Sequence, residues 1–137
     1  AMKETNSSFV QKGDTLYLVT SSEAVDYLNS SIDSGFITSL HRISGKGIFH
    51  SLVECCRDKS LGFDITGDSD LTDEEFLYGN TKYVAIVSVN NDQEGDFVNF
   101  MFNHGIETTL LGHVTKGELR MDDHSYGFIS EYAGKTA

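Results

Sequence analysis

The sequence lacks any long apolar run and contains no proline, internal repeat or low-complexity tract. No stretch approaches the roughly 18 consecutive apolar residues that a membrane-spanning helix requires, which argues against a protein that spans a membrane. The N-terminus is polar and has no apolar stretch of the kind found in secretory signal peptides. We therefore expect a cytoplasmic protein with no membrane partner.

Positive charge is also scarce, because 10 Lys and Arg residues stand against 21 Asp and Glu residues and give a net charge of −11. A chain of this charge has no positive field with which to displace counterions, so we expect no non-specific binding to nucleic acid. Such a chain can still bind a phosphate, but only at a local site formed by backbone N–H groups or a few Lys and Arg side chains.

Cysteine is limited to the adjacent pair Cys55 and Cys56. Neighbouring cysteines do not normally form a structural disulfide, and two sulfur atoms without nearby histidines are too few for a zinc site. We expect both to be reduced thiols on a helix, as is usual in intracellular proteins, and neither to act as a nucleophile. Apart from His41, which is considered below, the histidines are scattered without the spacing of metal ligands: His50, His104, His113 and His124.

What the sequence does contain is enough apolar side chain for one core, since 39% of its residues are hydrophobic. A length of 137 residues corresponds to about one domain. Residues 1–12 are polar, and Ala1 precedes Met2, so this segment is predicted to be a tag or linker arm. The folded domain is expected over residues 13–137.

Apolar periodicity predicts strands that alternate with helices. The predicted strands cover residues 15–20, 36–43, 61–65, 83–89, 108–115 and 118–121. The predicted helices cover residues 21–35, 48–56, 71–78 and 92–103. The tail over residues 122–137 is weakly patterned and could add one short element.

This alternation is typical of a domain built from α/β layers. The short turn at Gly117 predicts an antiparallel strand pair near the end of the chain, so the sheet is expected to be mixed. We therefore predict an α+β fold, partly like a ferredoxin fold, in which helices flank a mixed sheet.

The turn formed by residues 44–47, Ser-Gly-Lys-Gly, is the most informative candidate site, because it lies between a predicted strand and a predicted helix. Free N–H groups and the positive end of the helix dipole meet at such a point, and glycines let a ligand approach the backbone. Lys46 could add a positive charge and Ser44 a hydroxyl, which together describe a phosphate cradle. The alternative, which the spacing alone favours, is a turn that simply needs glycine and uses Ser44 as a helix N-cap.

Two further features have alternative interpretations. His41 could act as a general base only with a partner and a cleft, and the alternative is a histidine at a strand end that orders the following turn. The acidic run over residues 64–75 is similar to a calcium loop, but the glycine and the final glutamate are out of place for an EF-hand. A solvated acidic loop is therefore predicted there.

Four stretches, in order along the chain, resemble motifs of the C-terminal domain of the AIR synthase superfamily. Residues 13–18 (GDTLYL) are similar to the Gly-Asp-x-apolar strand that opens that domain. Residues 41–48 (HRISGKGI) resemble its His-Asp-x-Ser-Asp-Gly-Gly-Leu turn and the His-Ile-Thr-Gly-Gly-Gly form of the cyclo-ligase branch. Residues 76–80 (FLYGN) before an apolar strand are similar to Leu-Phe-Gly-Glu in the formylglycinamidine synthase branch, and residues 105–114 resemble the family's Gly-Ile … Ile-Gly-x-Val ending. The resemblance covers residues 13–121.

The departures from the family pattern concern its polar residues. The two acidic residues of the family's turn are Arg42 and Gly45 here, one glycine is Lys46, and the Glu after Phe-Gly is Asn80. These losses argue against a metal or acid–base role, so no catalytic residue and no metal ligand is predicted. The candidate phosphate- or nucleotide-binding residues by this resemblance are His41, Arg42, Ser44, Gly45, Lys46 and Gly47.

The resemblance implies a fragment of an ATP-dependent ligase of purine biosynthesis, which makes formylglycinamidine ribonucleotide from formylglycinamide ribonucleotide and glutamine-derived ammonia. It implies ATP and magnesium as cofactors of the whole enzyme. The implied partners are an N-terminal AIR-synthase-type domain and a glutaminase, and a dimer is a possible assembly. Because the family's ATP and metal ligands lie mainly in that N-terminal domain, this chain alone is expected to be inactive and to require no cofactor.

Three alternatives stay open. The first is the cyclo-ligase branch of the same superfamily, which closes the imidazole ring. Kinase branches, such as thiamine-phosphate kinase, fit the region around Asn80 less well. The third, from a different class of protein, is a degenerate scaffold or interaction domain without catalytic activity.

Overall fold

The computed structural model describes residues 7–20, 28, 35–43 and 45–133. One seven-stranded sheet runs through this part of the chain, in the order β2-β4-β1-β5-β3-β6-β7. The strands are β1 (Thr15–Val19), β2 (Ile37–Arg42), β3 (Gly62–Ile65), β4 (Ala85–Val89), β5 (Thr108–Thr115), β6 (Glu118–Met121) and β7 (His124–Phe128). The helices are α2 (Ile48–Arg57), α3 (Asp73–Tyr78), the 3₁₀ helix η1 (Asn91–Gln93), α4 (Glu94–Asn103) and α5 (Ser130–Ala133).

The predicted mixed sheet with flanking helices is confirmed. Strand β3 runs parallel to β6, whereas every other neighbouring pair of the sheet is antiparallel. Each predicted strand and helix in the described part has a counterpart within a few residues, and the helix predicted over residues 21–35 lies almost wholly outside that part. None of the described helices is long and apolar enough to cross a membrane.

The antiparallel pair expected at Gly117 is wrong in one respect, because β5 and β6 are not neighbours. Strand β3 lies between them and pairs with both. The link around Gly117 passes the start of β3, and Thr115 Oγ1 donates a hydrogen bond of 2.7 Å to the carbonyl oxygen of Glu118. A short turn reverses the direction of the chain, but it does not determine whether another strand is inserted between its two arms.

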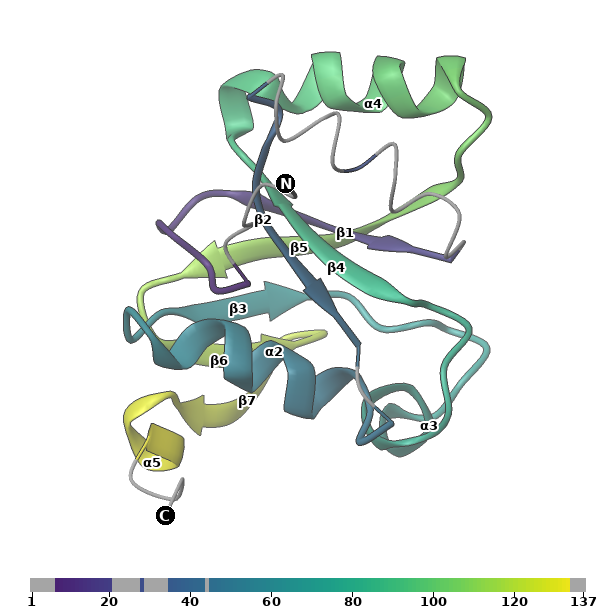
Figure 1. Cartoon of the computed structure of the whole chain (residues 1–137). Helices are drawn as coiled ribbons and strands as arrows, with labels where there is room; N and C mark the ends of the chain where they lie inside the picture. Colours follow the sequence, from purple (N-terminus) through teal and green to yellow (C-terminus); the bar gives the residue numbers. More distant parts are fainter. Residues whose placement is uncertain (1–6, 21–27, 29–34, 44, 134–137) are drawn as a thin grey trace.

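The sheet separates two apolar cores, and β1 contributes to both. Because side chains alternate along a strand, Leu16 and Leu18 enter the core that contains α2 and α3. Tyr17 and Val19 enter the other core, which contains Phe97 of α4. Figure 1 shows the strands lying between α4 and the group formed by α2, α3 and α5.

Residues 7–12 differ from the expected loose arm, because they pack onto α2. The side chain of Phe9 is fully buried in the core beneath α2. Its N–H donates a hydrogen bond of 2.9 Å to the carbonyl oxygen of Cys55. A single aromatic residue in a polar stretch creates no periodic pattern, which is why the sequence alone does not reveal this contact.

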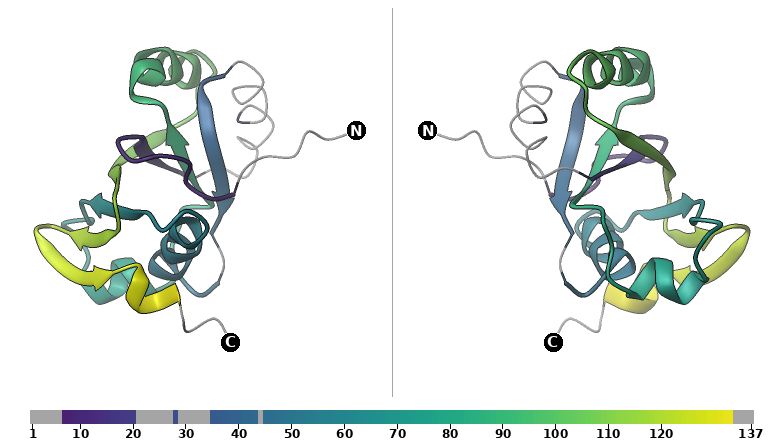
Figure 2. Two further views of the ribbon diagram at one scale, coloured as in Figure 1. Left: turned by 90° about the vertical axis from the view of Figure 1, so that its left-hand side faces the viewer. Right: turned by 90° about the vertical axis from the view of Figure 1, so that its right-hand side faces the viewer.

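The C-terminal tail forms two elements, β7 and α5, where the sequence pattern suggested one at most. Asp122 and Asp123 both have positive φ, 51° and 69°, and form the tight turn between β6 and β7. The hydroxyl of Tyr132 donates to the carbonyl oxygen of Tyr126 at 2.8 Å and ties α5 to β7. Figure 2 shows this hairpin and α5 projecting at one end of the molecule.

We predict that Phe9→Ala destabilises the domain by about 3–5 kcal/mol, because it removes a fully buried aromatic side chain and leaves a cavity. Urea unfolding of the whole chain measures this change. The matched control is Lys12→Ala in the same segment, an exposed position that should change the free energy of unfolding by about 0.5 kcal/mol or less. Equal stability of the two variants would show that this segment is not docked.

We also predict that Gly112→Ala destabilises the domain by roughly 1–3 kcal/mol, because a Cβ at this position would collide with the backbone of β3 at Asp64 and Ile65. Backbone atoms cannot turn aside as a flexible side chain can. Gly95→Ala in α4 is the control, since a Cβ there meets no atom within 4 Å and alanine favours helix. In thermal unfolding, the melting temperature of Gly95→Ala should equal or exceed that of the parent chain, and that of Gly112→Ala should be lower. The reverse order would show that β3 does not pack closely against Gly112.

Candidate functional site

The predicted phosphate cradle lies where β2 leads into α2, and Ser44 falls outside the described residues. Gly45 and Lys46 are exposed, whereas Gly47 is buried at the N-cap of α2. The first bond of the helix runs from the N–H of Ser51 to the carbonyl oxygen of Gly47 at 3.3 Å. The N–H groups that precede Ser51 in α2 therefore lie outside the helical ladder, as in the first turn of any helix.

Position 47 requires glycine both for its backbone conformation and for its close packing against α3. Its φ is 99°, a region that favours glycine. A Cβ at this position would lie 2.7 Å from the carbonyl oxygen of Leu77 and 3.1 Å from the Cα of Tyr78. The ring centroids of Phe49 and Tyr78 are 5.5 Å apart. The turn at residues 45–47 and the end of α3 therefore lie side by side, although they are far apart in the sequence (Figure 1).

His41 connects α2 to the N-terminal segment. Its Nδ1 lies 3.2 Å from the carbonyl oxygen of Ser7, and its Nε2 lies 3.7 Å from Oε1 of Glu54. The same carboxylate oxygen lies 3.4 Å from Nε2 of His50. Arg42, at the end of β2, is exposed. His41 thus contacts groups of the N-terminal segment and of α2.

Cys55 and Cys56 are free thiols on α2, as expected, and both are buried. Burial raises the pKa of both thiols, and for Cys55 the neighbouring Cys56 and Glu54 raise its pKa further. Because the thiolate is the nucleophilic form, these positions are unsuited to covalent chemistry.

The acidic residues between β3 and α3 make local hydrogen bonds. Asp68 Oδ1 accepts from the N–H of Asp70 at 2.9 Å. Thr72 and Glu75 form a capping box that closes the N-terminus of α3. No group of three or more potential metal-ligating side chains occurs among the described residues.

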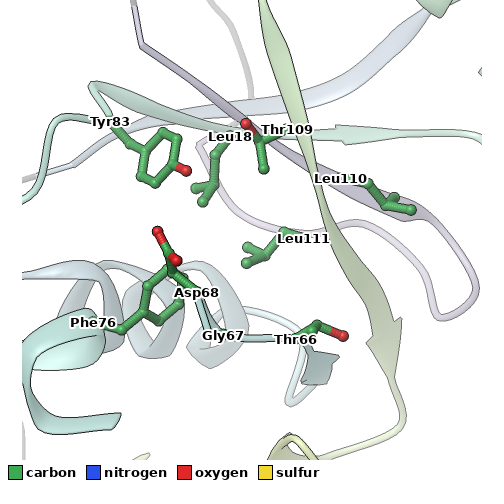
Figure 3. A pocket seen from close by; sticks show the side chains of 9 residues that line it. All are labelled: Leu18, Thr66, Gly67, Asp68, Phe76, Tyr83, Thr109, Leu110 and Leu111. Carbon is green, nitrogen blue, oxygen red and sulfur yellow. The ribbon is translucent and has the colours of Figure 1, made fainter. Parts of the chain in front are cut away.

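A cavity of about 290 Å³ lies beside α3, and no pattern in the sequence indicates it. Its lining includes the apolar side chains of Leu18 in β1, Phe76 in α3 and Leu111 in β5, and the polar side chains of Tyr83 and Asp68 (Figure 3). These residues come from five separate segments of the chain. No local spacing could therefore have indicated that they meet.

Comparisons with known proteins agree on one family. A sequence model of the AIR synthase related protein, C-terminal domain, matches residues 1–123. The phosphoribosylformylglycinamidine synthase subunit PurL of Carboxydothermus hydrogenoformans is 34% identical over 80 residues, which are 58% of this chain and 11% of that protein. The PurL subunit of Prochlorococcus marinus is 27% identical over 103 residues, covering 70% of this chain and 13% of that protein.

The fold is shared with solved structures at much lower identity. The structure of T. maritima PurL complexed with ATP superposes with a TM-score of 0.77 and 9% identity, over 94% of this chain and 27% of that one. This chain thus spans only a small part of the proteins it matches. Because the family model covers most of its length, the chain belongs to the AIR synthase related family and has the fold of that family's C-terminal domain.

Proposed function

We propose that this chain is a domain of a phosphoribosylformylglycinamidine synthase, the ATP-dependent ligase that converts formylglycinamide ribonucleotide and glutamine-derived ammonia into formylglycinamidine ribonucleotide. The observation that carries the proposal is the sequence similarity to two PurL subunits. The meeting of residues 45–47 with the end of α3 supports it, because both stretches resemble motifs of this family.

In this proposal the domain completes a nucleotide and substrate cleft together with an N-terminal AIR-synthase-type domain, and a glutaminase supplies ammonia. ATP and magnesium belong to the assembled enzyme. The acidic residues of the family pattern are replaced here by Arg42, Gly45 and Asn80. The contribution of this domain is therefore binding and positioning.

The start of α2 is the proposed contact for a phosphate group. A helix N-terminus carries about half a positive charge and directs free N–H groups outward. Because the chain has a net charge of −11, an anion can bind only where the local potential is positive, as it is at the start of a helix. The exposed positions Gly45 and Lys46 leave the approach to this end of the helix on the surface.

The same substitutions favour a second candidate function, a non-catalytic domain that only supports assembly. Arg42 and Gly45 replace acidic residues of the family turn. A supporting domain would bind its partner domain and bind no phosphate. The titration described below separates the two functions.

We predict that the purified chain hydrolyses no ATP and forms no amidine, because it spans only 11% and 13% of the two PurL relatives. ADP release and mass spectrometry of the nucleotide product measure both activities. An intact PurL enzyme with its glutaminase in the same buffer is the positive control. Turnover that co-purifies with the chain and scales with its concentration would contradict this prediction.

We predict that Gly45→Asp weakens binding of inorganic phosphate or ADP by about tenfold or more, because it places a like charge beside the start of α2. Gly45 suits this test because a Cβ there meets no atom within 4 Å. Gly47 is unsuitable for this test, because any side chain there would collide with the backbone of α3. Titration followed by amide NMR shifts gives the affinities.

Gly45→Ala is the matched control and should bind phosphate like the parent chain, since it adds a methyl group without charge. Lys46→Ala should weaken binding by less than Gly45→Asp, about two- to fivefold, if the backbone provides most of the contact. Shifts that cluster away from residues 45–48, or no shifts at saturating phosphate, would show that the turn has only a structural role.

A further inference from the structure

The cavity beneath β1 and β5 has a volume and lining suited to a small organic ligand. Its volume of about 290 Å³ is near the lower end for ligand pockets. The side chains of Leu18, Phe76 and Leu111 are buried and form an apolar wall. An apolar ring placed against this wall would exchange contact with water for contact with carbon.

Tyr83 supplies a hydroxyl that is bonded to no other residue in the described part of the chain. The residue is only 9% exposed, and its hydroxyl points into the cavity (Figure 3). Its backbone N–H donates a hydrogen bond of 3.1 Å to Thr81 Oγ1, whereas its hydroxyl makes no hydrogen bond to another described residue. Among the described residues the fully buried polar side-chain atom without a partner is Arg57 Nε, so the Tyr83 hydroxyl is reached by solvent from the cavity, where a ligand can replace water as its partner.

Asp68 is the charged side chain in the lining of the cavity, whereas Lys82, with its Nζ 5.4 Å from the centroid of the Tyr83 ring, lines a neighbouring hollow. Its carboxylate is directed toward the space below Tyr83, from the loop after β3 (Figure 3). One oxygen accepts from the N–H of Asp70, which leaves the other available to the cavity. Thr66 and Thr109 are the remaining polar side chains of the lining, and both are uncharged. A carboxylate beside an apolar wall attracts a cation and repels an anion.

We propose that this cavity binds a small organic cation, a ring that carries a protonated amine or amidine. The ring lies against Leu18, Phe76 and Leu111, and the nitrogen group lies between the carboxylate of Asp68 and the hydroxyl of Tyr83. The site is separate from the anion contact at the start of α2, so this proposal does not rest on the proposed function.

The test is an NMR titration of the whole chain with benzamidine, benzyl alcohol and benzoate, which share one ring and differ in charge. Benzamidine should shift the methyl signals of Leu18 and Leu111 and the amide of Thr109. Benzyl alcohol should bind about tenfold more weakly, because it lacks the charge-assisted hydrogen bond. Benzoate should cause no shift in these residues.

Two variants assign the polar contacts. Asp68→Asn should lower the affinity for benzamidine by about tenfold, to that of benzyl alcohol, whereas its exposed neighbour Asp70→Asn should change it by about twofold at most. Tyr83→Phe retains the ring and should weaken benzamidine binding without lowering the melting temperature, since the hydroxyl bonds to no described residue.

Three results would overturn the proposal. One is equal affinity for benzamidine and benzyl alcohol. Another is an equal loss of benzamidine affinity in Asp68→Asn and Asp70→Asn. The third is a set of benzamidine shifts that lies outside the cavity, or no shift at all at millimolar ligand. A loss of phosphate binding at α2 would leave these results unchanged, so the two proposals fail separately.

Discussion

The burial of β1 on both of its faces is the constraint on which the rest of the structure depends. All five of its residues are buried, and it pairs with β4 on one side and β5 on the other. Its alternating side chains create two cores, one closed by α2 and α3 and the other by α4. The candidate sites follow from this arrangement, because α2 begins where β2 ends and the cavity opens beside Leu18.

The motifs that resemble the AIR synthase family are, in this chain, the points where segments touch. The N–H of Gly13 donates to the carbonyl oxygen of Val114 at 2.8 Å, so two of the motifs pair directly. Buried Asp14 accepts from Gln11 and from Thr38 of β2, each at 2.8 Å. Gly112 allows the close approach of β3. These residues maintain the fold, which explains how the family remains recognisable where its acidic residues have been replaced.

Much of this fold could be predicted from the sequence, because strands and helices depend on local periodicity. The strand over residues 108–115 and the helix beginning at Ile48 were predicted from such patterns and are confirmed. The insertion of β3 between β5 and β6, the docking of Phe9 and the cavity at Tyr83 could not be predicted. Each depends on contacts between distant segments, about which the spacing of neighbouring residues carries no information. For the candidate turn, the sequence indicated its place before a helix but not its contact with α3.

The two sites proposed above, for an anion and for a cation, share one structural element. Gly47, at the start of α2, packs against the last residues of α3, and Phe76 of the same helix forms a wall of the cavity. Helix α3 has only six residues, too few to be stable by itself, so its position depends on its capping box and on packing. Its buried residues, Phe76 and Leu77, anchor it in the core with α2. A helix that is too short to fold alone is thus held in place by the same core that positions α2, and this core brings both proposed sites against α3.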